Sequence, residues 1–242
     1  MWVSPTQTRL LGLINEYEFH TSAQFDKGKA ISQLNGKRTY PQGGDTGSDP
    51  AGQKEYDRLI RELNQLSEQV PLDAPWTMPR AEHLDTLTVE QWLGSRTRNR
   101  DVISFLQLAL RTLFTTNPYQ MSLLYFLFYL HSGGNFETLI GLDEKSAQAF
   151  RVKETMHQVA VRLSKDVDQS LVLEAPVSEI SQDETGVTVK SIKGDWRAKY
   201  AIVAVPLPLS ARINYSPSLP PERDIPVQHM PDGLGYQVPG GL

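Results

Sequence analysis

Apolar residues recur every three to four positions over long stretches of the chain, the spacing that places them on one face of a helix. A first helix is predicted between Pro5 and Phe19, with the proline near its start, where helices accept it. The stretch 42–52 is rich in Gly, Asp, Ser and Pro and is predicted to be a loop. Two longer helices are predicted after it. Their apolar stripes are Tyr56, Leu59, Ile60, Leu63 and Leu66 in one and Val102, Ile103, Leu106, Leu110 and Leu113 in the other.

The stretch 122–131 is apolar on all sides, which is typical of a helix buried in a core. Gly133 and Gly134 are expected to end this helix. Upstream, Thr88 with Gln91 three residues on is a capping-box signature, which predicts the start of another helix.

Strand signals come in two places. The Asn-Gly pair at 35–36 indicates a tight hairpin turn. After a helical pattern over 148–165, the runs 171–177, 186–192 and 200–206 predict three strands, the last of the buried kind. Helices and strands do not alternate regularly, so the predicted fold class is α+β.

Charge and composition exclude several classes of function. The chain of 242 residues has 24 Lys and Arg against 28 Asp and Glu, a formal net charge of −4. Nucleic acid is not expected as a partner, because phosphate binding needs a dense basic surface. The longest apolar run, 121–130, is shorter than the roughly 20 residues of a membrane span, so no membrane segment is expected.

The chain has no cysteine, which excludes disulfides, zinc–thiolate and iron–sulfur sites and cysteine nucleophiles. The absence of cysteine fits a reducing compartment. Met1 is not followed by a basic and then an apolar leader segment. A cytoplasmic location is therefore expected.

No short motif names a reaction by itself. The five histidines are far apart and form no HxxxH or HxxE pair, so no metal site is expected. The sequence contains no GxSxG, no GxxxxGK[ST] and no GxGxxG. Composition and periodicity alone lead to an α+β protein with an apolar helical core.

Several longer stretches are distinctive when they are taken together. They are Trp2-Val-Ser-Pro-Thr-Gln-Thr-Arg-Leu10; Glu68–Trp76 with Pro79, Leu87, Thr88, Trp92 and Leu93; Ser122–Gly134; Val172–Val177 with Ile180, 186–189 and 201–206; and Tyr215–Pro221 with Arg223. In this order and at these spacings they resemble the flavin-containing amine oxidases, the monoamine oxidase family. The resemblance covers nearly the whole chain up to Pro231.

The resemblance implies a two-part α+β fold, with an FAD domain built from separated segments and a helical substrate domain. This chain corresponds to the central fragment, without the family's N-terminal phosphate loop and C-terminal flavin and substrate segment. The resemblance assigns 1–41 to a partial FAD and substrate segment and 42–147 to the helical substrate region. It assigns 148–206 to a helix plus strands of the FAD domain, and 207–242 to a return to the substrate domain with a divergent tail.

The resemblance also assigns cofactor-binding residues. It implies that Trp2 lies close to the flavin ring and that Val177 contacts the adenine end of FAD through its backbone. Ala204 and Pro206 match a strand that returns beneath the cofactor. Without the resemblance, Val177 is an ordinary strand residue. Lys153-Glu154 stands where the family has a glycine pair, so the local cofactor geometry is expected to differ.

Four further positions are implied to bind substrate. Gln148 matches a glutamine that faces substrate, Leu139 falls near the pocket entrance, and Thr112 and Leu113 fall on its lining. For Leu139, Thr112 and Leu113, packing in a core is an equally good interpretation. An apolar pocket would favour the neutral amine and exclude water.

Two functions are therefore expected. The first is an FAD-dependent amine oxidase that takes a small-molecule amine to an imine, with release of hydrogen peroxide. No residue of the chain is assigned as its catalytic acid or base. The alternative is a catalytically inactive fragment that acts as a binding protein, by self-association or with a complementing chain.

Overall fold

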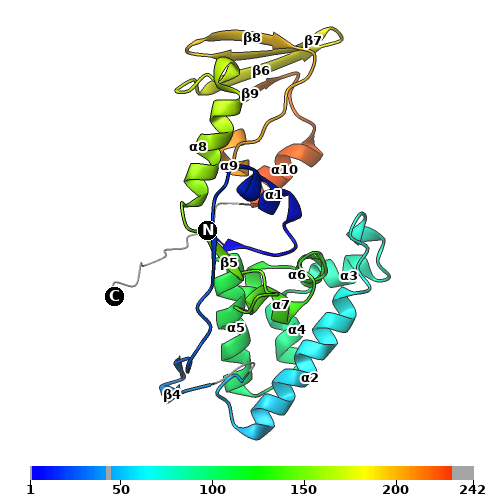
Figure 1. Ribbon diagram of the computed structural model, residues 1–242. Coiled ribbons are helices and arrows are strands. Elements are labelled where there is room, and N and C mark those ends of the chain that lie inside the picture. The colour runs from blue at the N-terminus through cyan, green and yellow to red at the C-terminus, as the bar shows by residue number, and fades with distance from the viewer. Residues whose placement is uncertain (1, 42–44, 231–242) are drawn as a thin grey trace. The chain divides into compact units, whose positions relative to one another are not determined.

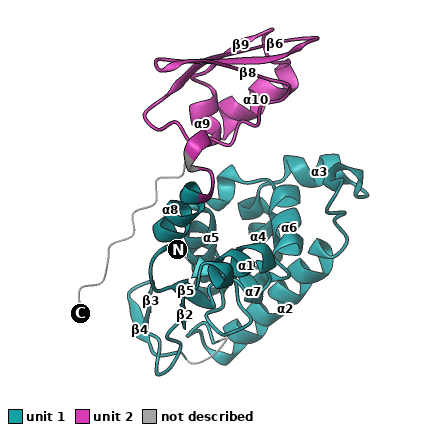
Figure 2. Ribbon diagram, turned by 45° about the horizontal axis from the view of Figure 1, so that its top comes forward, with its two compact units in different colours: residues 1–165 teal, residues 166–242 magenta. Residues whose placement is uncertain are grey.

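The computed structural model describes residues 2–41 and 45–230, which form two compact units, 1–165 and 166–242 (Figure 1, Figure 2). Unit 1 holds most of the helices, and unit 2 is built on one sheet (Figure 2). This division rests on compactness alone, so the assignment of segments to an FAD and a substrate domain stays a prediction. Within the part of the chain that the structure describes, no helix is long and apolar enough to cross a membrane.

Unit 1 combines a helical bundle with short strands. Its helices are α1 (Thr8–Glu16), α2 (Pro50–Ser67), η1 (Pro75–Thr77), α3 (Ala81–Thr86), α4 (Val89–Arg96), α5 (Arg100–Phe114), η2 (Pro118–Gln120), α6 (Leu123–Ser132), α7 (Phe136–Ile140) and α8 (Met156–Asp166), whose last residue belongs to unit 2. Its strands are β1 (Trp2–Val3), β2 (Thr21–Ala23), β3 (Ser32–Leu34), β4 (Lys37–Thr39) and β5 (Phe150–Val152).

The bundle of α2 to α7 encloses the main core. The predicted stripe of α2 faces it, and Leu59, Ile60 and Leu63 are almost fully buried. α6 packs against α2, with Phe126 and Leu130 fully buried. Burying each such side chain contributes about 1.5–3 kcal/mol to folding.

The prediction that 122–131 is buried on all sides is wrong for one face of α6. Tyr125 is 42% exposed, and Tyr129 is half-buried against Phe114, with ring centres 4.7 Å apart. The helix lies at the wall of the bundle, because α2, α3 and α4 cover only part of its circumference.

Local signals at the helix starts are confirmed. Thr88 Oγ1 accepts a hydrogen bond from Gln91 N at 3.1 Å, and Gln91 Oε1 accepts one from Thr88 N at 2.9 Å, which completes the predicted capping box of α4. The predicted loop ends at Asp49, which caps α2 by accepting from Gly52 N at 2.7 Å. Part of that loop, 42–44, lies outside the described residues.

The hairpin signal at 35–36 is also confirmed. β3 and β4 pair antiparallel, and the turn between them consists of Asn35 and Gly36. Their φ angles are 50° and 79°, as a two-residue turn of type I′ requires.

A second, smaller core lies under a three-stranded sheet with the order β1-β5-β2. Val3 and Val152 from the sheet pack against Ile14 of α1 and Val159 of α8. The helical pattern predicted over 148–165 is wrong for its first part, because Phe150–Val152 is the central strand here. Three residues are too few to show a strand period, and pairing with two distant segments decides their conformation.

Unit 2 is a four-stranded sheet with the order β8-β7-β6-β9, together with short helices. Its elements are η3 (Asp168–Ser170), β6 (Val177–Asp183), β7 (Gly186–Ser191), β8 (Gly194–Ala198), α9 (Leu207–Ser210), β9 (Asn214–Ser216) and α10 (Pro221–His229). β9 pairs with β6 in parallel, and the other pairs are antiparallel. Ile180, Val189 and Trp196 are in register, so they share one face of the sheet.

Two predicted strands of unit 2 are not formed. Of 171–177 only Val177 is in a strand, and 200–206 has no regular structure. The side chains of this second segment lie open to solvent, with Ile202 94% exposed and Tyr200 77% exposed. An apolar run becomes a strand only when a neighbouring strand satisfies its backbone, and within the described ranges none pairs with this segment.

Candidate cofactor and substrate site

Trp2 lies on the edge strand β1, directly opposite Arg151 of β5. The guanidinium carbon of Arg151 is 4.9 Å from the centre of the Trp2 ring, within the range of a cation–π contact. The next residue, Val3, is fully buried in the small core, so Trp2 extends from the opposite face of the sheet. The Trp2 side chain is half-buried.

Gln148 lies between an acidic turn and β5. In this turn Asp143 Oδ1 accepts hydrogen bonds from the backbone N of Lys145 at 2.8 Å and from Ser146 Oγ at 2.9 Å. These hydrogen bonds hold the pKa of the Asp143 carboxyl below its ordinary value. The turn fixes where the chain enters β5. It therefore also fixes the backbone position of Gln148, whose side chain is half-buried.

Leu139 is a core residue of the short helix α7. Asn64 of α2 holds the start of this helix, because its Oδ1 accepts from Phe136 N at 3.1 Å and its Nδ2 donates to Glu137 at 2.8 Å. Leu139 is 6% exposed and packs in the bundle. A side chain at Gly133 would come within 2.5 Å of it. The structure favours the core-packing alternative here, and the entrance role stays a prediction.

Thr112 and Leu113 are neighbours on α5 but have different surroundings. Leu113 is half-buried and packs against the bundle core. Thr112 is exposed, and its Oγ1 donates to the carbonyl of Leu108 at 2.9 Å. Its hydroxyl is therefore already partnered within its own helix.

Val177 begins β6 next to an irregularity in the sheet. The register with β7 shifts between Val177 and Glu179, and the pairing with β9 starts at Glu179. A bulge of this kind leaves backbone groups outside the ladder, as a backbone contact with a ligand requires. Ala204 and Pro206 lie in the exposed segment after β8, and the Pro206 carbonyl accepts from Leu209 N at the start of α9.

The structure brings some of these residues together and leaves others apart. Trp2 lies opposite Arg151 in the β1–β5 pairing. Gln148 lies in the turn two residues before β5, and the residue before it, Ala147, donates to the carbonyl of Thr138 on α7 at 2.9 Å. Leu113 and Leu139 share the bundle core. The other three predicted cofactor residues, Val177, Ala204 and Pro206, lie in unit 2. Arg151 was not predicted, because a single arginine in a three-residue strand carries no signal in the sequence.

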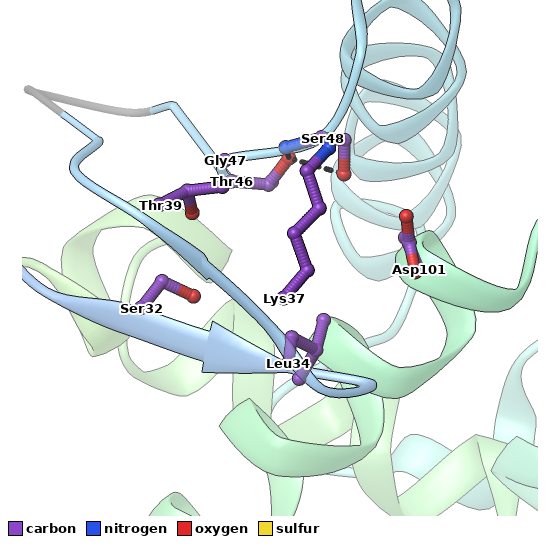
Figure 3. A pocket seen from close by; sticks show the side chains of 8 residues that line it. All are labelled: Ser32, Leu34, Lys37, Thr39, Thr46, Gly47, Ser48 and Asp101. Carbon is purple, nitrogen blue, oxygen red and sulfur yellow. Dashed lines mark hydrogen bonds between the residues drawn. The ribbon is translucent and has the colours of Figure 1, made fainter.

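Two hollows on the surface of unit 1 are lined by other residues. One has a volume of about 10 Å³, room for roughly one water. Figure 3 shows Lys37 reaching across it from β4 towards the segment of Thr46 and Ser48. The other, about 400 Å³, is shallow and is lined by residues 6–10 at the start of α1. Neither includes a predicted substrate residue.

Some titratable groups of the described residues have structural partners. No three His, Asp or Glu side chains in the described ranges are placed to hold a metal ion. His131 Nδ1 lies 2.7 Å from the carbonyl of Val70, where it joins α6 to the segment that follows α2. Burial raises the pKa of Tyr56 well above its ordinary value, so this phenol stays protonated in the core.

Comparison with known proteins decides the family. Residues 1–239 match the family model described as flavin containing amine oxidoreductase. The chain belongs to this family. A probable flavin-containing monoamine oxidase A from Dictyostelium discoideum is 32% identical over 235 residues, which are 96% of this chain and 51% of that protein. An L-amino acid dehydrogenase from Synechocystis is 29% identical, and the match covers 96% of this chain and 50% of that protein.

Solved structures of the family give the same fold. A putrescine oxidase has a TM-score of 0.88 and 31% identity, with 94% of this chain and 51% of that chain covered. A cyclohexylamine oxidase from Brevibacterium oxydans has a TM-score of 0.87 and 26% identity. The chain spans about half the length of the relatives it matches. The α+β flavin amine oxidase fold predicted from the sequence is therefore confirmed, and so is the flavin cofactor of the family.

The residues present fit one part of an FAD molecule. The flat indole of Trp2 beside the planar guanidinium of Arg151, both in unit 1, suits a conjugated ring. The 242 residues include no glycine-rich phosphate loop, so they offer no such cradle for the pyrophosphate. The fit is to a ring system of the cofactor.

Proposed function

We propose that this chain acts as an FAD-dependent amine oxidase, which takes an amine to an imine that hydrolyses to the aldehyde, with release of hydrogen peroxide. The observation that carries this proposal is the match to the amine oxidoreductase family along residues 1–239. Trp2 on β1 and Gln148 in the turn before β5 support it, because they would supply an aromatic wall and a hydrogen-bonding amide. FAD supplies the hydride acceptor when it is bound.

The chain's own residues would bind and orient the amine. The carboxamide of Gln148 can accept a hydrogen bond from an amine nitrogen, and Leu113 offers an apolar surface. An apolar surrounding disfavours the ammonium form and so raises the share of neutral amine, which carries the free electron pair. No described side chain is needed as a base in this account.

Spectroscopy tests the proposal. The chain is loaded with FAD and mixed without oxygen with a primary alkyl amine, a polyamine, an arylalkyl amine or an amino acid. Bleaching of the flavin bands, followed by peroxide release in air, is expected for at least one class. Gln148→Leu should raise KM, whereas Gln69→Leu, which changes an exposed glutamine just after α2, should not. A flavin-loaded chain that no amine bleaches contradicts the proposal.

One observation favours the second candidate, a binding protein without catalysis. Segment 200–205 of unit 2 is apolar and strongly exposed, with Ile202 94% exposed and Val205 46% exposed. Exposed apolar surface favours association, either with a second copy or with a complementing chain that carries a phosphate loop. Light scattering of the purified chain tests this, because an inactive monomer at all concentrations contradicts self-association.

We propose a cytoplasmic location on the ground that the chain contains no cysteine. Fractionation of the producing cells tests this, and recovery outside the cytoplasmic fraction contradicts it.

A further inference from the structure

We propose that Arg151 is a positioning residue, which holds the Trp2 ring in the orientation that receives the flavin of FAD. This inference rests on the proposed function and assigns a role to a residue that sequence patterns do not mark. The two residues face each other across the β1–β5 ladder, with 4.9 Å between the guanidinium carbon and the ring centre.

Trp2 needs such a constraint because its strand is weakly held. β1 has two residues and lies at the edge of the sheet, so two ladder pairs fix its backbone. The neighbouring Val3 is locked by the small core, but Trp2 points away from that core. Backbone pairing therefore places the Trp2 Cα without choosing the orientation of the ring.

Arg151 can supply that constraint. The guanidinium is planar, stays charged and stacks well on aromatic faces. It comes from the central strand β5, which is paired on both sides, with Trp2 on one and Ser22 on the other. Within the described ranges no carboxylate lies at ion-pair distance from Arg151. The guanidinium of Arg151 contacts the Trp2 ring instead.

The chain offers a matched control beside the same small core. Arg162 of α8 lies 5.1 Å from the centre of the Tyr17 ring, a contact of the same kind at an exposed arginine. Arg162→Gln removes one arginine–aromatic contact and leaves the Trp2 pair intact. Arg151→Gln removes the Trp2 contact, and Arg151→Lys keeps its charge.

The first readout uses the protein without FAD. Indole N–H resonances are recorded by NMR, and the Trp2 signal is assigned as the one missing from Trp2→Phe. Arg151→Gln should shift and broaden this signal, Arg151→Lys should largely restore it, and Arg162→Gln should leave it in place. An unmoved Trp2 signal in a folded Arg151→Gln chain overturns the positioning role.

The second readout is the dissociation constant of FAD, measured by flavin fluorescence. Arg151→Gln should weaken binding by about threefold to thirtyfold, the range expected for loss of one such contact, with recovery in Arg151→Lys. Equal affinity in wild type and Arg151→Gln overturns the inference and leaves the proposed function standing. No FAD binding by the wild type contradicts the proposed function, and with it the cofactor role of Arg151.

Discussion

Glu154 accepts two hydrogen bonds from His20, a residue 134 positions away in the chain. Its Oε2 accepts from the backbone N of His20, and its Oε1 lies at the same 2.9 Å from His20 Nδ1. The backbone of Lys153 in turn donates to the His20 carbonyl at 2.9 Å. These contacts join the end of β5 to the start of β2, the side of the small sheet opposite β1.

The contact between Glu154 and His20 should make the free energy of unfolding depend on pH in the acidic range. The hydrogen bond from the backbone of His20, followed by the contact with its ring, holds the pKa of Glu154 below its ordinary value of 4.5. A lowered pKa contributes stability that is present above 4.5 and is lost as the pH falls through the lowered value. Glu154→Gln should therefore unfold more easily than wild type at pH 7, and this difference should vanish in acid.

Urea unfolding of both chains over a range of pH measures this difference. Glu144→Gln serves as control, because it changes an exposed glutamate in the turn before β5. If Glu154→Gln and wild type differ by the same amount at every pH, the carboxylate of Glu154 is not the source of the effect.

Asn64 should contribute more to the stability of the fold than an exposed asparagine elsewhere in unit 1. Asn64→Ala leaves the backbone N of the fully buried Phe136 without its partner and should cost about 1–3 kcal/mol. Thermal or urea unfolding measures the loss. Asn15→Ala, at an exposed position of α1, should have a much smaller effect. Equal effects of the two variants would contradict the role given to Asn64 in holding α7.

The capping box of α4 makes a graded prediction. Thr88→Ala removes the oxygen that accepts from Gln91 N and should cost about 1 kcal/mol, within a range of about 0.5–2. Thr88→Ser keeps the hydroxyl oxygen and should restore most of this free energy. Unfolding curves of wild type, Thr88→Ala and Thr88→Ser measure these differences. A serine variant as unstable as the alanine variant argues against the cap.

Signals that act over three or four residues were predictable from the sequence. The Thr88 box and the Asn35-Gly36 turn depend on local hydrogen bonds and allowed φ angles, so the sequence specifies them directly. The α2 stripe was also predictable, because burial of one helix face leaves a period in the sequence.

Features that depend on distant partners were not predictable. Phe150–Val152 is a strand because β1 and β2 pair with it. The apolar segment 200–206 was predicted as a buried strand, yet it lies open because no described strand pairs with it. The position of Arg151 over Trp2 depends on sheet register, which no local pattern encodes.

The exposed segment should govern association without affecting the fold. Ile202→Lys changes a side chain that is 94% exposed, so the unfolding free energy should stay within about 0.5 kcal/mol of wild type. Any concentration-dependent oligomer should decrease. Val187→Lys instead places a charge at a buried position of the same unit and should unfold the sheet. Light scattering measures association and circular dichroism measures folding in both variants. An unchanged oligomer in Ile202→Lys contradicts the role of the exposed segment in association.

Retention of FAD tests the central claim most directly. The purified chain is mixed with FAD, freed of excess cofactor and measured by visible absorption, alongside Trp2→Leu. Membership of the flavin-containing family predicts retained flavin bands in wild type. The contact between Arg151 and the Trp2 ring predicts weaker retention in Trp2→Leu. A folded wild-type chain that stays colourless after exposure to excess FAD would contradict the account.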